Sequence, residues 1–163
     1  MTYNYAEKWS RSYKEAIKPL TEAQARKRHE KKGALYTALL GDDPIRPRAF
    51  VEIVSGDSIQ VDFLDKEFRS SASYQFIQQP DGRLFMVMAV FRQFDSETMK
   101  NVFGHSLHFK PDGYVLSIEE DFRTNTQTRQ EKTMDVSLNW EPYPEFGRYE
   151  SIARFDRDRP PDS

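Results

Sequence analysis

The chain has 163 residues, of which 37% are hydrophobic, 13% aromatic and 31% charged. This length suits one domain with a substantial core, and the aromatic content excludes a chain that is disordered throughout. It contains no cysteine, which excludes disulfides, thiolate nucleophiles and zinc sites built on sulfur.

The net charge of −2 at pH 7 conceals an uneven distribution. Residues 1–41 contain nine Lys or Arg and four Asp or Glu, a net charge of +5, and the remainder carries −7. Segregated charge of this kind steers charged partners. The N-terminus has no apolar run of signal-peptide length, and the longest apolar run, residues 84–91, is too short to span a membrane. We therefore expect a cytoplasmic protein without a membrane partner.

Residues 6–18 are predicted to form a first helix. Trp9, Tyr13 and Ile17 recur at a spacing of four, which places them on one helical face. Pro19 disfavours the helical conformation in the residue before it and so ends the segment.

A second helix is predicted from Thr21 to the helix-terminating Gly41. Thr21 and Gln24 have the spacing of a capping box, in which each side chain accepts a backbone hydrogen bond from the other residue. This helix carries the basic run from Arg26 to Lys32, "RKRHEKK". The run fits either a phosphate-contacting surface or a solvated helix face, and the sequence pI of about 6.0 favours the solvated face.

After a turn-rich linker at residues 42–48, the hydrophobic period changes from helical to two. Three hairpins are predicted, joining "FVEIV" to "IQVDFL", "SYQFIQ" to "RLFMVMAVFRQF", and "HSLHF" to "YVLSIEEDF". The last two contain the turn Pro-Asp-Gly at residues 80–82 and 111–113. Proline suits the first central position of a type I turn, and glycine suits the left-handed position that follows.

Two further strands are predicted near the C-terminus. Residues 133–140 alternate strictly between apolar and polar side chains, and residues 148–155 show a weaker alternation. The charged tail at 156–163 is expected to fray.

These elements predict an α+β fold in one domain covering residues 1–163. Its helical part is residues 1–41 and its sheet part is residues 50–155. Two N-terminal helices would pack on a curved, mainly antiparallel sheet of about seven or eight strands built from successive hairpins. Residues 84–91 are apolar at successive positions, so this strand is expected in the centre of the sheet, covered on both faces.

The stretch "YVLSIEEDF" at residues 114–122 ends in three consecutive acids. Strand alternation sends Tyr114 and Glu120 to the face expected to be apolar, and sends Glu119 and Asp121 to the other face. The three carboxylates therefore do not converge on one catalytic point. Glu119 and Asp121 are predicted to contact a partner, whereas a buried Glu120 would need a cation such as Arg92 or Arg123.

The stretch "NWEPYPEFGRYE" at residues 139–150 combines aromatic and acidic residues with two prolines. Prolines stiffen a loop, and aromatic side chains on a stiff loop make effective binding residues. We expect Trp140 to continue the core, whereas Tyr143 and Phe146 fit either the core or an exposed contact surface. The residues predicted to bind a partner are Glu119, Asp121, Glu141, Tyr143, Glu145 and Phe146.

No motif in the sequence specifies a reaction or a cofactor. The chain lacks a Walker loop, a dinucleotide-binding GxGxxG and a GxSxG elbow. His105 and His108 lie three apart on a predicted strand, so they point to opposite faces. We therefore predict no catalytic residue, no metal site and no cofactor.

The preferred functional hypothesis is a non-catalytic protein-binding module whose acidic sheet face and aromatic loop mask a basic partner. In size, and in combining an α+β fold with an acidic face, the chain is similar to bacterial immunity proteins. That resemblance implies a cytosolic inhibitor of a basic toxin, and charge complementarity would speed its capture.

Two alternatives remain open. The curved sheet could hold a pocket for a small apolar ligand, with Tyr114 and Glu120 in it and Glu120 as an acid or base. The basic helix from Arg26 to Lys32 could bind nucleic acid, although the rest of the chain is acidic and offers no stacking platform.

Overall fold

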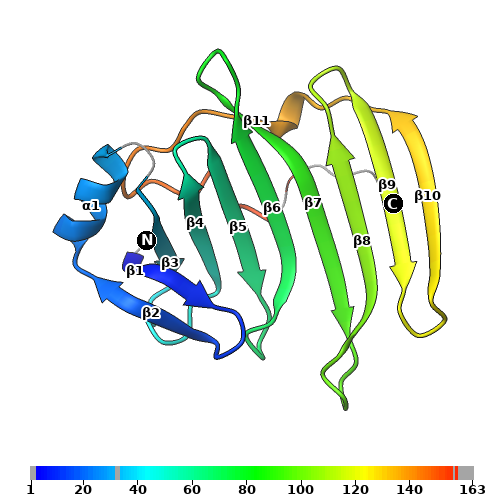
Figure 1. Cartoon of the computed structure of the whole chain (residues 1–163), viewed down its shortest axis with the longest axis horizontal. Coiled ribbons are helices and arrows are strands. Elements are labelled where there is room, and N and C mark those ends of the chain that lie inside the picture. The colour runs from blue at the N-terminus through cyan, green and yellow to red at the C-terminus, as the bar shows by residue number, and fades with distance from the viewer. Residues whose placement is uncertain (1–2, 32–33, 156, 158–163) are drawn as a thin grey trace.

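The computed structural model describes residues 3–31, 34–155 and 157. Their fold is one antiparallel sheet with a single α-helix (Figure 1). The strands are β1 (Tyr3–Ser10), β2 (Glu15–Leu20), β3 (Tyr36–Leu40), β4 (Ala49–Ser55), β5 (Ser58–Leu64), β6 (Ser70–Gln78), β7 (Leu84–Phe94), β8 (Asn101–Phe109), β9 (Tyr114–Asp121), β10 (Thr126–Thr133) and β11 (Trp140–Glu141). The helix α1 spans Glu22–Glu30, and a short 3-10 helix η1 spans Ser137–Asn139.

The strand order follows the chain closely. It runs β10-β9-β8-β7-β6-β5-β4-β3-β1-β2, and β11 pairs with one end of β7. Short turns join most neighbouring strands, whereas α1 lies between β2 and β3. The Pro-Asp-Gly turns form as predicted, with Gly82 and Gly113 at φ of 88° and 96°. The order leaves two edge strands, β2 and β10, at opposite ends of a curled sheet (Figure 1).

The prediction of an α+β fold, with two N-terminal helices on a sheet of about seven or eight strands, is wrong, because the described residues form an 11-stranded sheet with one α-helix. Residues 6–18 form the β1–β2 hairpin, and only α1 is helical. The residues expected to complete a second helix instead form β3, whose five residues are all buried because β1 and β4 pair with it on either side. The capping box of Thr21 and Gln24 is confirmed at the start of α1. Gly33 lies outside the described residues.

The predictions for the C-terminal strands are also wrong. The chain leaves β10 at Thr133 and continues as η1 and the two-residue strand β11, whereas residues 148–155 form turns. The Asp135 carboxylate accepts a hydrogen bond from the Ser137 backbone N–H, at 2.9 Å. This local bond favours a turn over a continued strand. Of the tail predicted to fray, only Arg157 is described, and its side chain is buried.

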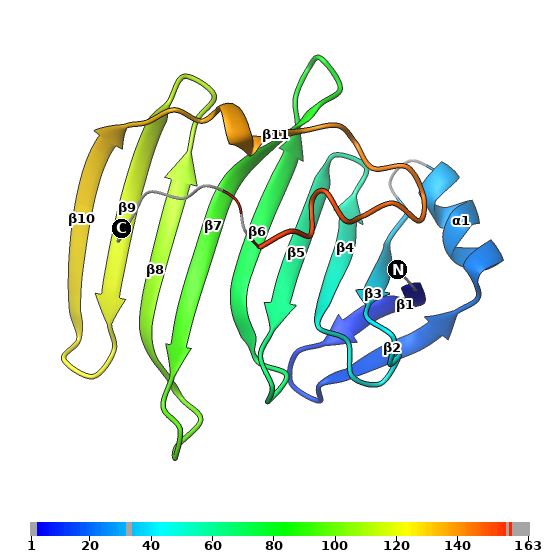
Figure 2. The same cartoon turned by 180° about the vertical axis from the view of Figure 1, so that it is seen from behind.

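We call residues 137–155 and Arg157 the covering segment. The segment crosses one face of the sheet, as Figure 2 shows. It buries Tyr149, Ile152 and Ala153 against the large apolar side chains of β3 to β7. The opposite face has a much smaller apolar cluster, formed by Trp9, Leu39 and Phe50. The central position predicted for residues 84–91 is confirmed by β7, but the covering segment lies on one face of the sheet only.

A buried ion pair fixes the end of the covering segment. Arg157 Nη2 lies 2.6 Å from Glu141 Oε1, and both side chains are buried. Arg157 also donates to the carbonyl oxygens of Leu138 and Ser151, at 2.9 and 2.8 Å. Its guanidinium lies 5.2 Å from the ring centre of Phe76. Because Glu141 lies on β11, which pairs with β7, the ion pair ties Arg157 to the sheet through that strand.

Breaking this pair is expected to destabilise the protein. Removing one partner leaves the other charge buried without compensation, which typically costs about 3–5 kcal/mol. We expect Glu141→Gln and Arg157→Met each to lower the free energy of unfolding by about 3 kcal/mol in urea denaturation. The double variant should lose less than the sum of the two single losses, because the interaction can be lost only once. Strictly additive losses would contradict this role.

Candidate functional site

A hollow of about 300 Å³ lies between the β1–β2 hairpin and strands β5 to β7. Its lining side chains on β5 and β6, such as Gln60, Asp62 and Ser73, alternate along the strands with core residues such as Val61 and Tyr74. The pleat therefore places the hollow on the face opposite the covering segment. We call it the open-face pocket. Its lining residues are Trp9, Arg11, Lys14, Gln60, Asp62, Leu64, Phe68, Arg69, Ser70, Ser73, Arg92 and Phe94.

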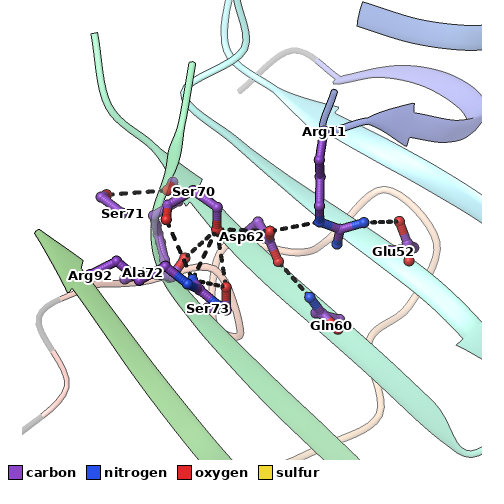
Figure 3. A network of polar contacts seen from close by, with 10 residues as sticks. Arg11, Glu52, Gln60, Asp62, Ser70, Ser71, Ala72, Ser73 and Arg92 are labelled. Carbon is purple, nitrogen blue, oxygen red and sulfur yellow. Dashed lines mark hydrogen bonds and ion pairs between the residues drawn. The ribbon is translucent and has the colours of Figure 1, made fainter. Parts of the chain in front are cut away.

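Asp62 is the hub of the polar network in this pocket (Figure 3). Its side chain is almost fully buried. One carboxylate oxygen accepts from Arg11 Nε at 3.2 Å and from Ser70 Oγ at 2.8 Å, and the other accepts from Gln60 Nε2 at 2.8 Å. A buried carboxylate is tolerated when it is paired and hydrogen-bonded in this way. The donors around Asp62 therefore fix its position.

Arg11 links Asp62 to a second acid, Glu52. Arg11 Nη1 lies 3.7 Å from Glu52 Oε2, and its guanidinium carbon lies 5.1 Å from the ring centre of Phe50. Burial raises the pKa of the Glu52 carboxyl, the Arg11 charge opposes that shift, and the Asp62 charge adds to it. The positive charge of Arg11 is thus already shared between two carboxylates.

Arg92 reaches the pocket from β7 and is bonded differently. Its Nη1 donates to Ser73 Oγ at 2.9 Å and approaches the hydroxyl and carbonyl oxygens of Ser70 at 3.4 Å (Figure 3). It forms no ion pair within the described part of the chain. Burial lowers the pKa of the Arg92 guanidinium, and the nearby Asp62 charge only partly offsets that shift. Arg92 is therefore a half-buried cation held in place by neutral oxygens.

The rim of the pocket contains unusual backbone. Lys14 and Phe68 adopt left-handed φ angles of 56° and 58°, which are uncommon for residues other than glycine and unfavourable for a bulky residue. Such conformations concentrate at functional sites. The buried indole Nε1 of Trp9 has no acceptor among the described residues. Arg69 on the rim is paired with Asp65 at 2.9 Å.

The sequence-based site residues lie elsewhere. Glu119 and Asp121 lie on β9, with Asp121 paired to Arg123 at 3.3 Å. Tyr114 and Glu120 lie on the opposite face of β9, both partly exposed, and neither lines the open-face pocket. The Arg92 and Arg123 partners expected for Glu120 bond instead to serines and to Asp121.

The predicted recognition loop is mostly built into the core. Glu141 is buried in its ion pair, and Tyr143 and Phe146 pack against the main core. The Phe146 ring stacks on Tyr5 with ring centres 5.1 Å apart. Glu145 is exposed. This loop starts at β11, beside β7, and runs toward the β1–β3 end of the sheet, whereas β9 lies near the other end (Figures 1 and 2).

The basic helix has structural partners for several of its charges. Arg26 pairs with Glu22 and lies over the Phe146 ring, and Arg28 Nη2 lies 2.7 Å from Glu7 Oε1. Lys32 lies outside the described residues. These contacts anchor α1 to β1 and to the covering segment.

His29 on this helix begins a buried chain of hydrogen bonds. Its Nδ1 lies 2.7 Å from the Tyr36 hydroxyl, which lies 2.8 Å from the Tyr149 hydroxyl. Burial lowers the pKa of His29 and raises the pKa of both tyrosines. The chain therefore links α1, the sheet and the covering segment through neutral groups.

Sequence reasoning missed the open-face pocket. Arg11 was assigned to a helix, and Arg92 was considered only as a partner of Glu120. The signal was present in "IQVDFL", where Asp62 occupies the polar face of a strand among apolar neighbours. Bringing Arg11 beside it requires the long-range pairing of β1 with β3.

Comparisons with known proteins do not assign this chain to a family. No family model matches it, and neither curated proteins nor solved structures match it significantly. The resemblance to immunity proteins, and the inhibition of a toxin that it implied, therefore have no support, and the mainly β fold contradicts the α+β class on which the resemblance rested. Among the described residues, no group of three or more His, Asp or Glu is placed to hold a metal ion. No helix in that part of the chain is long and apolar enough to cross a membrane.

The lowered pKa of His29 predicts a pH-dependent stability. The unfolded chain takes up this proton near the ordinary pKa of 6.5, whereas the folded chain takes it up at lower pH. Folding stability is therefore complete above about pH 6.5 and falls as the pH decreases through the folded pKa. We expect His29→Gln to reduce the loss of stability between pH 7.5 and pH 5, measured by urea denaturation.

His105 contributes in the same direction, because burial lowers its pKa too and its Nε2 lies 2.8 Å from Ser117 Oγ. Some pH dependence should therefore persist in the His29→Gln variant. The partly exposed His108, replaced by Gln, is the matched control. An unchanged pH dependence in His29→Gln would contradict the burial argument.

Proposed function

We propose that this protein binds a small organic anion in the open-face pocket. The observation that carries the proposal is Arg92, a half-buried cation whose hydrogen bonds to the described residues go to neutral oxygens of Ser70 and Ser73. Removing a cation from water without a counter-charge is unfavourable, and an anionic ligand would offset that cost. Arginine is also well suited to paired hydrogen bonds with a carboxylate or phosphate.

The remaining lining residues support an anion. Arg11, Lys14 and Arg69 add three cations, against Asp62 as the one acid that lines the pocket. Two of these cations already have acidic partners, Arg11 with Asp62 and Arg69 with Asp65. Lys14 on the rim forms no ion pair with any described residue. Together with Arg92 it supplies positive charge that the described residues leave uncompensated.

The apolar walls support a ligand with a planar or apolar body. Leu64, Phe68 and Phe94 line the pocket with Trp9, and the Arg69 guanidinium lies 4.5 Å from the Phe94 ring centre. A volume of about 300 Å³ is at the lower end of the range for small-molecule sites. An aromatic carboxylate or phosphate combines the charge, shape and size that these walls accommodate.

The protein-binding and nucleic-acid-binding alternatives receive less support. Asp121 shares its charge with Arg123, and Arg26 and Arg28 in the basic helix are paired with glutamates. Glu120 does not line the open-face pocket, so this site gives no support to the acid or base role suggested for it. In the open-face pocket the Ser70 hydroxyl donates to Asp62, but that carboxylate also accepts from Arg11 and Gln60, so we propose binding without a reaction.

Isothermal titration calorimetry with benzoate, phenyl phosphate and uncharged benzamide tests this function. We expect one site for at least one anion and weaker binding of benzamide. A charge-assisted hydrogen bond contributes about 1.5–3 kcal/mol, so Arg92→Met should weaken anion binding by about 10–100-fold. Exposed Arg148, replaced by Gln, is the matched control for loss of an arginine outside the pocket.

The stability of the Arg92→Met variant gives an independent readout. If Arg92 serves a ligand, removing this uncompensated charge should leave the free energy of unfolding unchanged or raise it in the absence of anions. Equal binding of benzoate and benzamide, or binding that survives Arg92→Met, would reject the proposed function.

A further inference from the structure

The two edges of the sheet differ in how they are protected. β2 contains Pro19, which lacks a backbone N–H, and Lys18, whose φ of 53° departs from a strand conformation. β10 contains no proline or glycine, and its pairing with β9 has no register shift over eight residues. Proline and irregular backbone are devices that prevent edge pairing. β10 has neither, and it is almost entirely exposed.

The register with β9 shows which backbone groups of β10 are free. The Met134 N–H donates to the Gly113 carbonyl oxygen at 2.8 Å, just beyond the strand. Backbone bonding in an antiparallel pair alternates along the strand. Residues 126, 128, 130 and 132 therefore bond to β9, whereas Gln127, Arg129, Glu131 and Thr133 direct their N–H and C=O groups to the open edge.

The side chains at the open edge are self-complementary. Arg129 and Glu131 lie on the same face of the sheet, on either side of Gln130. If a second β10 pairs antiparallel with its two-fold axis at Gln130, each Arg129 lies directly opposite the Glu131 of the other chain. Residue 127 then lies opposite residue 133. In this register each residue with free backbone N–H and C=O groups lies opposite another such residue of the second chain. All four of these residues can therefore form backbone hydrogen bonds across the edge.

The neighbouring registers are excluded by charge. Outward-facing residues still meet each other when the two-fold axis shifts by one residue in either direction, to Arg129 or to Glu131. One step puts Arg129 opposite itself, and the other puts Glu131 opposite itself. Like charges directly opposite each other destabilise a pair of strands, whereas opposite charges contribute about 0.2–1 kcal/mol. The Gln130-centred register is the favourable one.

We propose that the β10 edge is a docking surface for a second copy of this chain, paired antiparallel about Gln130. Neither Arg129 nor Glu131 forms an ion pair with another described residue. The Glu131 side chain accepts a hydrogen bond from Tyr114, which raises the pKa of that tyrosine. Edge pairing without a packed second layer buries less surface than the roughly 1,200–2,000 Å² of a stable interface. The dimer is therefore a reversible, concentration-dependent species.

Sedimentation equilibrium of the full chain tests this pairing across a wide range of protein concentrations, at low and high salt. We expect a monomer–dimer equilibrium that weakens as salt increases. Arg129→Glu places four carboxylates around the axis, and Glu131→Arg places four guanidiniums there, so each should weaken dimerisation at least tenfold. The double variant R129E/E131R recreates the opposite pairs with exchanged positions and should restore the dimer.

The charge swap also separates this pairing from a folding defect. Both side chains are exposed, so the thermal melting of each single variant should remain close to that of the parent. A protein that stays monomeric at every concentration would overturn the proposal. Dimers insensitive to the single substitutions, or a double variant that fails to recover, would overturn it equally.

Amide hydrogen exchange measured by NMR tests the register residue by residue. At low concentration the amides of residues 128, 130 and 132 should exchange slowly, because they bond to β9, and those of residues 127, 129, 131 and 133 should exchange fast. Raising the concentration should protect the second group selectively. Uniform protection along β10, or none, would contradict the Gln130-centred register.

Discussion

The rest of this structure depends on one constraint: a short segment of chain must bury one face of a single wide sheet. A sheet exposes apolar area on whichever face lacks a second layer. Here the second layer is the covering segment, which lies over the apolar side chains of β3 to β7. The Glu141–Arg157 pair at its end holds a guanidinium within the core, 5.2 Å from the Phe76 ring centre. The position of Arg157 is thereby coupled to the packing of the sheet.

The same constraint explains the polar network on the other face. With no second layer over β5 to β7, the outward positions of these strands must tolerate water, and several are occupied by Gln60, Asp62, Ser73 and Arg92. The β1–β2 hairpin places Trp9 and Arg11 beside them and turns part of this face into a pocket. Asp62 is held by three donors. Arg92 contributes charge that these contacts do not balance, so the pocket favours an anion.

Local sequence signals predicted the hairpins but not the N-terminal fold. The Pro-Asp-Gly turns and the strand β7 depend on neighbouring residues, and both were predictable. Trp9, Tyr13 and Ile17 have a helical spacing, but they lie in β1, in the turn and in β2, and the register places Ile17 opposite Lys8, on the other face from Trp9. Residues 3–10 form a strand rather than a helix because they pair with β3, which is buried at all five of its residues. Such long-range pairing overrides local propensity.

Long-range packing also explains why the sequence did not predict the open-face pocket and why the predicted site residues lie elsewhere. Arg11 and Asp62 are 51 residues apart and meet only through the strand order. The loop with Tyr143 and Phe146 has the composition of a binding loop, but the sheet offers few other large side chains to cover its β1–β3 end. The Phe146 ring therefore packs on Tyr5 and Tyr36, and the Tyr143 ring lies beside His29. The sequence alone could not distinguish covering the core from contacting a partner.

An open sheet must also limit its own association, and its two edges do so by different means. At β2, Pro19 and the left-handed Lys18 interrupt the regular pattern of donors and acceptors. At β10 the backbone is regular, and selectivity rests on the order of Arg129 and Glu131. Parallel, in-register stacking of β10 would align identical charges, and antiparallel pairing shifted one step would do the same. The order of the charges therefore disfavours indefinite stacking of chains but permits one two-fold register. In a two-fold dimer both β10 edges are paired, so no β10 edge remains for a third copy.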